Sequence, residues 1–286
     1  MLDDTPQVLK DLWTDINTVV QEACAGLNLD AIRDEIIELR GFYRQPELRG
    51  APHFALPETR LAYAVAYHPS HAYSYLDLLS RQQFGPKLFA SMHRPLNVLV
   101  LGAGIGAETI AVLRWLHSQN CTWFRTSQLT LVDRAPWDDT RTLILEPMIR
   151  DSIQFFELGI RHVHADVSTL EGHEVLKKHI PQADLILAPS LVTELITEHS
   201  EEQLHVCLRN FMRPGSRLLL VDHGYPKFQH VAFQWSRDFK DVPNATSQSR
   251  VAIPRPSEWI SKNLLIGTSG LIPITKYDLS WFLLER

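Results

Sequence analysis

Apolar residues in the first 85 positions recur at the spacing of amphipathic helices. Those between residues 5 and 43 are Val8, Leu9, Leu12, Ile16, Val19 and Val20, then Ile32, Ile36, Ile37 and Leu39. This pattern predicts two helices separated near residues 26–28, with Asn28 or Asp30 able to cap the second. Residues 44–57 are rich in proline and predict a loop, after which 58–79 is helical again except at Pro69. We therefore predict a helical cap over residues 1–90.

The pattern changes at Asn97. Residues 97–101 form a continuous β-prone run that is followed by glycines and then by a helical pattern over 107–116. Similar short runs recur at 129–132, 162–164, 184–187 and 217–221, separated by stretches long enough for helices. Such alternation is typical of an α/β fold with a doubly wound, mostly parallel sheet. We expect this second domain to occupy residues 91–286.

The end of the chain departs from this alternation. Two β-prone runs, 271–275 and 278–284, are separated only by Lys276 and Tyr277, which is too short for a crossover helix and suits an antiparallel hairpin. Before them, between Gly224 and Pro256, the periodicity fades. The aromatic residues there recur near helical spacing and are Phe228, Phe233, Trp235 and Phe239. We predict that residues 225–256 form an insertion that covers the substrate.

Composition narrows the class of protein. The chain has 286 residues, 45% of them apolar, and a formal charge of −5. It has no long basic stripe, so nucleic acid is a disfavoured partner. Its three cysteines are widely spaced, and its acidic N-terminus lacks the features of a signal peptide. We expect a cytoplasmic protein with no membrane segment, and the sequence leaves open whether it forms a homodimer through its N-terminal helices.

The glycine-rich segment that follows the run at 97–101 indicates a nucleoside cofactor. Gly102, Gly104 and Ala107 fit the dinucleotide pattern GxGxxG/A, while Gly102, Gly104 and Gly106 fit the GxGxG of enzymes that use S-adenosylmethionine (SAM). Glycines at such a turn let the backbone approach a ligand closely. The segment alone therefore does not distinguish NAD from SAM.

Three further features bear on that choice. Asp133 ends the second predicted strand, where a carboxylate can accept both ribose hydroxyls of either cofactor. Asp166 and Val167 follow the third strand, where a side-chain acceptor could take the adenine amino group. The antiparallel hairpin predicted at the chain end resembles the reversed last strand of class I methyltransferases. The last two features favour SAM.

At these residues the sequence resembles the class I SAM-dependent methyltransferases. The segments LVLGAGIG, LTLVD, HADV, DLILAPSLVTEL and RPGSRLLLVDHG stand in the order of that family's motifs, over residues 95–286. The resemblance implies a seven-stranded sheet with a reversed last strand. It implies SAM as cofactor, with a set of binding residues that comprises Gly102, Ala103, Gly104, Gly106, Asp133, Arg134, Asp166, Val167 and Ser190. Many members have an acidic residue two places before the first glycine, where this chain has Val100.

A second resemblance is to the Rsm22-like proteins associated with mitochondrial and bacterial small ribosomal subunits. It is carried by RLAYAVAYHP at 60–69, LVTEL at 191–195 and LVDHGYP at 220–226. That family's cysteine cluster is missing here, and the acidic balance does not favour RNA. This resemblance nevertheless provides an alternative, an rRNA methyltransferase or ribosome-associated assembly factor that keeps the SAM fold.

Methyl transfer requires an oriented nucleophile and, where that nucleophile carries a proton, a base. Two candidate catalytic residues follow predicted strands, Glu194 after the fourth and His223 after the fifth. Each has a plainer interpretation, since Glu194 could simply stabilise the first turn of a helix and His223 could be an ordinary loop histidine. The pattern does not rank the two.

Candidate substrate-binding residues lie on both sides of the glycine segment. Tyr67, His68 and His71 precede it and could fold over the site as a lid, and Tyr225 follows the fifth strand. Core packing is the commoner role for such residues. Trp137 could stack on adenine or close the wall of the pocket. His162 and His164 share one face of a strand with no third ligand in view, so we predict no metal site.

Together these patterns predict a SAM-dependent methyltransferase that acts on a small organic molecule. The rival enzyme is an NAD-dependent dehydrogenase, which would need a proton relay such as Tyr-x-x-x-Lys, and the expected stretch contains none. The ribosome-associated alternative remains open.

Overall fold

The computed structural model describes residues 6–44, 52, 54–81, 96–119, 128–150, 157–265 and 276–286. Its N-terminal part is helical, as predicted. The helices are α1 (Gln7–Ala23), α2 (Leu29–Arg44), α4 (Pro57–Ala66) and α5 (His68–Arg81). Asn28 caps α2, because its Oδ1 accepts hydrogen bonds from the N–H groups of Asp30 and Ala31. The break predicted at Pro69 lies instead at Tyr67, since proline is tolerated in the first turn of a helix.

The second part is built on one seven-stranded sheet with the order β3-β2-β1-β4-β5-β7-β6. The strands are β1 (Asn97–Leu101), β2 (Gln128–Asp133), β3 (Gly159–His164), β4 (Leu185–Pro189), β5 (Arg217–His223), β6 (Lys240–Ala252) and β7 (Lys276–Glu285). The first five are parallel, and β7 is antiparallel to both β5 and β6. This confirms the predicted α/β class and the reversed last strand.

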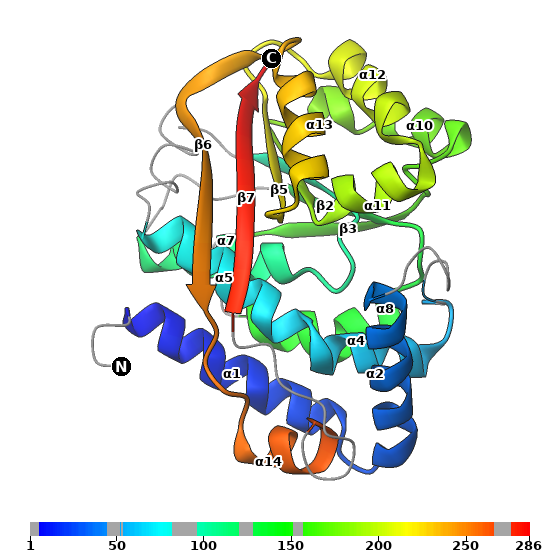
Figure 1. Ribbon diagram of the computed structural model, residues 1–286, viewed down its shortest axis with the longest axis vertical. Helices are drawn as coiled ribbons and strands as arrows, with labels where there is room; N and C mark the ends of the chain where they lie inside the picture. The colour runs from blue at the N-terminus through cyan, green and yellow to red at the C-terminus, as the bar shows by residue number, and fades with distance from the viewer. Residues whose placement is uncertain are drawn as a thin grey trace.

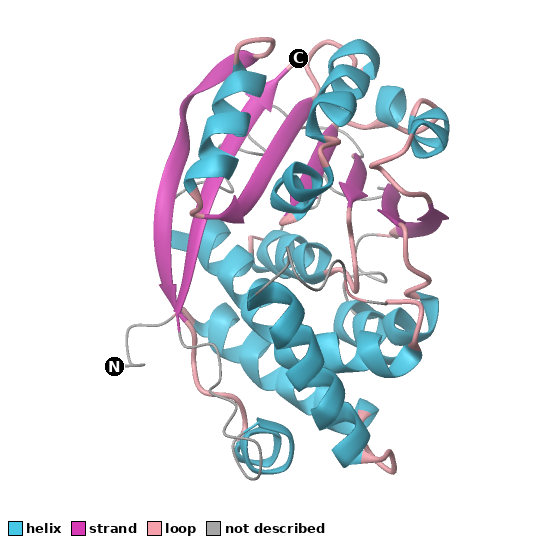
Figure 2. Ribbon diagram, turned by 45° about the vertical axis from the view of Figure 1, so that its right-hand side comes forward, coloured by secondary structure: helices cyan, strands magenta, loops and turns pink. Residues whose placement is uncertain are grey.

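Helices cover both faces of the sheet (Figure 2). The larger ones of the α/β part are α7 (Ala107–Ser118), α10 (Leu170–Leu176), α11 (Leu191–Glu198), α12 (Glu201–Phe211) and α13 (Pro226–Ser236), and short turns are α8 (Asp138–Thr140), η2 (Arg141–Leu145), η3 (Ile180–Gln182), α14 (Glu258–Ile260) and η4 (Ser261–Leu265). Alternate side chains of β1 point to opposite faces of the sheet and pack in two different hydrophobic cores. Val98 and Val100 pack with α1, α5 and α7, whereas Leu99 and Leu101 pack with α10 to α13.

The predicted insertion over 225–256 is wrong. These residues form α13 and the edge strand β6, and Phe228, Trp235 and Phe239 are buried against the sheet rather than placed over a substrate. Only Phe233 of that aromatic set is substantially exposed. The periodicity fades because β6 is an edge strand whose middle, 243–249, is polar, and an edge strand needs little apolar alternation.

The hairpin predicted at the chain end is wrong. Lys276 and Tyr277, which were expected to form its turn, begin β7 and pair with Ala252 and Val251 of β6. The run predicted at 278–284 is confirmed as part of β7, and 271–275 lies outside the described residues. Within the described part, β7 pairs along its length with β5 on one side and β6 on the other (Figure 1). The reversed strand is therefore inserted between two strands that both precede it in the chain.

The helical cap is held to the rest of the chain at both ends. In Figure 1, α14 (orange) lies beside α1 (blue) at the lower end of the molecule. The Trp13 indole N–H donates to the Arg255 carbonyl at 3.0 Å, and the Ser257 N–H donates to the Asn17 side-chain oxygen at 3.0 Å. The segment after β6 therefore completes the packing of the first helix.

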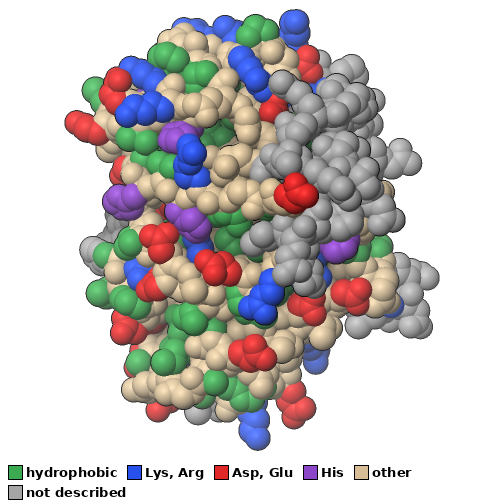
Figure 3. Space-filling model, turned by 180° about the vertical axis from the view of Figure 1, so that it is seen from behind, with side chains coloured by type: hydrophobic (Ala, Val, Ile, Leu, Met, Phe, Trp, Pro, Cys, Tyr) green, Lys and Arg blue, Asp and Glu red, His purple; other side chains and the backbone are tan. Residues whose placement is uncertain are grey.

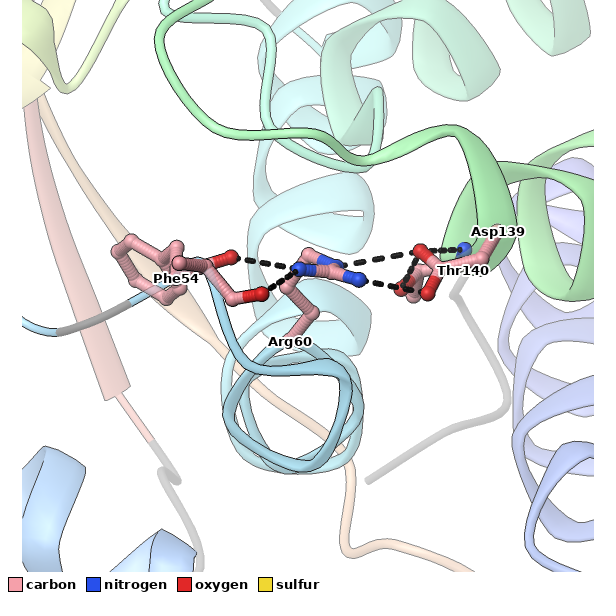
Figure 4. A network of polar contacts seen from close by, with 5 residues as sticks. Phe54, Arg60, Asp139 and Thr140 are labelled. Atoms are coloured by element: carbon pink, nitrogen blue, oxygen red, sulfur yellow. Dashed lines mark hydrogen bonds and ion pairs between the residues drawn. The ribbon is translucent and has the colours of Figure 1, made fainter.

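A buried arginine joins α4 of the cap to the loop after β2 (Figure 4). The Arg60 guanidinium, 5% exposed, donates to both carboxylate oxygens of Asp139 at 3.1 and 2.6 Å. It also donates to the carbonyls of Phe54 and Ala55 at 2.7 and 2.8 Å. Although burial acts to raise it, the net pKa of Asp139 is lowered by Arg60 and Thr140, which favour the carboxylate. Arg60 thus links the loop at 54–55 and helix α4 of the cap to the Asp139 carboxylate.

None of the helices in the described residues is long and apolar enough to cross a membrane.

Candidate functional site

The order of the strands reverses at β1, because β2 and β3 lie on one side of it and β4 and β5 on the other. In a parallel sheet this places a crevice at the carboxyl ends of β1 and β4. Gly102, Gly104 and Gly106 have φ angles of 65°, 49° and 99°, all in the left-handed region that favours glycine. A Cβ on Gly106 would lie 3.0 Å from a methyl group of Leu145, and one on Gly102 would lie 3.1 Å from a methyl group of Leu191. The glycines therefore let the loop turn tightly against its neighbours.

Asp133 anchors this loop from the end of β2. Its Oδ2 accepts a hydrogen bond from the Gly104 N–H at 2.8 Å, and its Oδ1 accepts one from the Ala135 N–H at 2.8 Å. A carboxylate offers about four acceptor positions, so two remain for a ligand. The geometry therefore fits the predicted ribose contact and adds a structural role that the sequence did not indicate.

An open cavity of about 840 Å³ lies over this end of the sheet. Its wall contains most of the predicted site residues, namely Gly102, Ala103, Gly104, Asp133, Arg134, Asp166, Val167 and Ser190 from the cofactor set, with Glu194, His68 and His71. The wall does not include Gly106, His223, Tyr67 or Tyr225. The cofactor set thus converges on one space, whereas the catalytic and substrate candidates are divided.

The adenine end of the predicted site is at the loop after β3. The Asp166 Oδ1 accepts hydrogen bonds from the N–H and the hydroxyl of Ser168, at 2.9 and 2.6 Å. Beside it, the Arg134 guanidinium donates to Glu198 at 2.6 Å. Asp166 retains acceptor capacity toward the cavity, so its contact with adenine stays a prediction.

The cavity wall after β4 includes a strained residue. Ser190 has a φ of 50° although it is not glycine, and its hydroxyl oxygen is buried without a hydrogen-bond partner among the described residues. Its N–H donates to the Val221 carbonyl at 2.7 Å, which holds this conformation. Strain of this kind costs on the order of 1–3 kcal/mol and concentrates at ligand sites.

Glu194 follows in the first turn of α11. Its side chain is exposed to water in the open cavity, although protein surrounds it on several sides. The surrounding protein desolvates the carboxyl group and so raises its pKa, and the positive charge of Arg134 opposes the shift. A carboxylate so placed can accept a proton from a group bound in the cavity.

His223 is connected to this region through its neighbour. The buried Asp222 carboxylate accepts hydrogen bonds from the Thr193 N–H at 3.0 Å and the His223 N–H at 2.7 Å, and burial raises its pKa to about 6. Burial also lowers the pKa of His223, which Asp278 opposes. The ring of the exposed Tyr225 lies 5.4 Å from the His223 ring, centroid to centroid.

Two neutral histidines of the cap face the cavity. Burial lowers the pKa of both His68 and His71 to about 3, and for His71 the charges of His223 and His68 lower it further. Both imidazoles are therefore uncharged at neutral pH. His71 is close enough to His223 for their charges to interact, so the cap and the end of β5 meet here.

A cluster of aromatic side chains lines the cap side of the cavity, and the sequence analysis did not predict it. The Tyr63 ring lies 5.4 Å from Phe54, 5.4 Å from Tyr67 and 5.7 Å from Trp137, between centroids. Trp137 is 3% exposed and closes the cavity wall, one of its two predicted roles. The four-residue spacing of Tyr63, Tyr67 and His71 could have indicated that these three side chains lie close together. Phe54 carried no such signal.

Glu108, in the first turn of α7, was also missed. It is 6% exposed, and its Oε2 has no hydrogen-bond partner within the described ranges. Burial raises its pKa to about 8, Asp133 adds to the shift and Arg141 opposes it. A single acidic residue in the first turn of a helix is ordinary in a sequence, so only the structure distinguishes it.

Of the two histidines on β3, His162 makes polar contacts with charged side chains. The Arg141 guanidinium donates to the Gly104 carbonyl at 2.8 Å and lies 2.9 Å from His162 Nδ1, which is also 3.2 Å from the Asp138 carboxylate. Burial and Arg141 lower the pKa of His162. Over the described ranges, no three His, Cys, Asp or Glu side chains are placed to hold a metal ion.

The sheet order, the glycine loop and Asp133 define a class I SAM-dependent methyltransferase. The chain belongs to the family described as "Putative SAM-dependent methyltransferase", whose model matches residues 51–228, more than half of its length. Its cofactor is therefore SAM, and the NAD-dependent alternative is set aside. No curated protein matches the chain.

Solved structures with a similar fold include several methyltransferases. Precorrin-6y C5,15-methyltransferase from Geobacter metallireducens is 13% identical, with 72% of this chain and 90% of that chain covered and a TM-score of 0.43. The N-methyltransferase NodS from Bradyrhizobium japonicum, in complex with S-adenosyl-L-homocysteine (SAH), is 14% identical, with 74% and 87% covered and a TM-score of 0.38. A "putative RNA methyltransferase" from Pyrococcus horikoshii is 10% identical, with 76% and 85% covered and a TM-score of 0.43. None of these likenesses identifies the methyl acceptor of this chain.

Proposed function

We propose that this enzyme transfers the methyl group of SAM to a small organic molecule that contains a flat unsaturated ring. The observation that carries the proposal is the aromatic group on the cap side of the cavity, built from Phe54, Tyr63 and Trp137. Aromatic side chains prefer offset-stacked or edge-to-face contacts with flat rings, so this wall would orient such an acceptor.

The lining of the cavity supports a cofactor and a small acceptor side by side. The glycine loop and Asp133 line one side, and Phe54 and Tyr63 line the cap side, so both ligands would meet in one space. The acceptor would enter between the cap helices and the carboxyl ends of the strands. Neutral His68 and His71 would add polar contacts without a positive charge.

Surface charge supports a small molecule over a nucleic acid. On the face shown in Figure 3, basic and acidic side chains are interspersed, and the residues drawn in colour form no continuous basic patch. The net charge is −5. Nucleic-acid sites neutralise phosphates with clustered lysines and arginines, which this face does not offer.

Within this proposal, Glu194 is the base that takes a proton from the acceptor. It lines the cavity, and its raised pKa makes it a stronger base than an ordinary carboxylate. His223 lies outside the cavity wall and would act on His71 rather than on the acceptor.

The proposal is tested with SAM labelled on its methyl group. The purified protein is incubated with the small-molecule fraction of a cell extract and, separately, with total RNA. Label that enters a small molecule supports the proposal, and label that enters only RNA overturns the small-molecule assignment in favour of the rRNA alternative. Label in neither fraction, with protein that binds SAH, also contradicts it.

Matched variants then locate the acceptor. Tyr63→Leu removes the aromatic face and should raise KM for the acceptor by about tenfold or more, whereas Tyr63→Phe keeps the ring and should have a small effect. Phe233→Leu, at an exposed site on α13 that does not line the cavity, is the control. Equal KM values for Tyr63→Leu and Phe233→Leu would contradict the assigned role of the aromatic wall.

A further inference from the structure

Glu108 is a buried carboxyl group that the protein itself leaves incompletely bonded. It is 6% exposed, and its Oε2 contacts no hydrogen-bond donor in the described part of the chain. Leaving a buried polar group unsatisfied costs about 1–3 kcal/mol, and more when the group is charged. A group kept at this cost in a cavity wall indicates a ligand that supplies the missing partner.

The position of Glu108 relative to the sheet indicates which part of the cofactor it meets. Asp166 follows β3 and Asp133 follows β2, so the predicted adenine and ribose lie over that side. The rest of the cofactor must then extend over β1 toward β4. Glu108 is on that side, because it lines both the main cavity and a smaller apolar pocket whose wall includes Tyr75 and Pro189.

The buried carboxyl group of Glu108 suits a positively charged part of the ligand. The amino-acid end of SAM carries an ammonium group, which donates up to three hydrogen bonds and favours a carboxylate in a site of low polarity. Val100, two places before the first glycine, is fully buried, and its side chain cannot accept a hydrogen bond. Glu194 and Glu198 lie beside Arg134, and Asp133 and Asp166 each hold backbone N–H groups. Within the described residues, Glu108 Oε2 has no hydrogen-bond donor, and Arg141 acts on Glu108 through its charge.

We propose that the Glu108 carboxylate accepts a hydrogen bond from the α-ammonium group of SAM and so makes the site select a cofactor that carries an amino-acid tail. This inference rests on the cofactor of the family and not on the proposed acceptor. A ligand that contains the same adenosine but lacks the amino-acid tail gains nothing from Glu108. The two ligands that separate these cases are SAH and 5′-methylthioadenosine.

The experiment is calorimetric titration of the full-length protein and its Glu108→Gln variant with each ligand. Glutamine keeps the shape and removes the charge. We expect SAH to bind about 10- to 100-fold more weakly to the variant, the range for one charge-assisted hydrogen bond. Affinity for 5′-methylthioadenosine should stay within about threefold. The control is Asp133→Asn, which should weaken both ligands by similar factors because both contain the ribose.

Proton release gives a second readout. Burial raises the pKa of Glu108 to about 8, so the free protein holds a proton there at pH 7 and must release it when the ammonium group binds. Titrations in two buffers of different ionisation heat should show proton release with SAH for the wild type and less for Glu108→Gln. Should the glutamine variant fail to fold, Glu108→Asp, which retains the charge on a shorter side chain, should weaken SAH selectively.

The proposal is overturned if Glu108→Gln binds SAH as the wild type does, or if it weakens both ligands equally. Because these are binding measurements, they stand apart from the test of the acceptor. A failed acceptor assay with selective loss of SAH affinity would overturn the proposed substrate only, and the converse result would overturn only the role of Glu108.

Discussion

The Asp133 carboxylate accepts a hydrogen bond from the Gly104 N–H at 2.8 Å, which ties the end of β2 to the glycine loop after β1. The same carboxylate holds the Ala135 N–H, so Asp133→Ala would release two backbone groups as well as any ligand contact. Asp133→Asn is the cleaner variant, since the amide retains one acceptor oxygen. We expect it to lower SAH affinity about 10- to 100-fold, measured by calorimetry. Unchanged affinity in a folded Asn variant would exclude the ribose contact.

Gly104 and Gly106 should respond differently to an added methyl group. At Gly104 a Cβ would have no neighbour within 4 Å, and this residue lines the cavity, so Gly104→Ala should weaken SAH binding. Its stability should fall only by about 1–2 kcal/mol, the cost of a left-handed alanine. At Gly106 the Cβ would meet Leu145 at 3.0 Å, so Gly106→Ala should unfold at a distinctly lower urea concentration. Equal unfolding midpoints for the two variants would contradict this difference.

Arg60→Ala should destabilise the protein by about 3 kcal/mol, because it leaves the carbonyls of Phe54 and Ala55 and the carboxylate of Asp139 without their shared donor. The comparison is Arg250→Ala. Arg250 makes a similar two-bond contact with Asp278, but both side chains are more than half exposed. Exposed ion pairs contribute little, so Arg250→Ala should be close to wild type in urea unfolding. Similar losses for the two variants would show that burial does not set the strength of the Arg60 contact.

The stability of the protein should depend on pH through Glu108. Its pKa is about 8 in the folded protein, above the value of 4.5 for the free side chain, so folding favours the protonated form. That contribution is present below about pH 4.5 and is lost as the pH rises toward 8. Relative to wild type, Glu108→Gln should therefore gain stability between these pH values, by up to about 1.4 kcal/mol per pH unit. Urea unfolding of both proteins at several pH values, without ligand, measures this difference in stability. A difference that does not change with pH would contradict the prediction.

Much of the α/β part could be predicted from the sequence because four of its parallel strands, β1, β2, β4 and β5, are largely buried. The runs at 97–101, 129–132 and 217–221 are continuous and apolar, and each became a strand. β6 was mistaken for an insertion because an edge strand with a polar middle has no such signal. β6, the strand after α13, was therefore the weakest point of the prediction.

The part of the candidate site that lies on loops directly after strands could be predicted from the sequence. The glycines and Asp133 follow strands directly, so sequence order places them together. Glu108 and the aromatic group depend on how the cap packs against α7, which local spacing does not determine. Sequence reasoning also assigned Asp133 only to a ligand, since hydrogen bonds to backbone N–H groups leave no trace in residue order.

The contacts of Trp13 and Asn17 with Arg255 and Ser257 have a consequence for the order of folding. α1 leaves the ribosome before these partners, which follow about 240 residues later. Until then, part of its surface lacks the segment that will cover it. Final docking of α1 must therefore be a late event, and contacts this distant in the chain are slow to form.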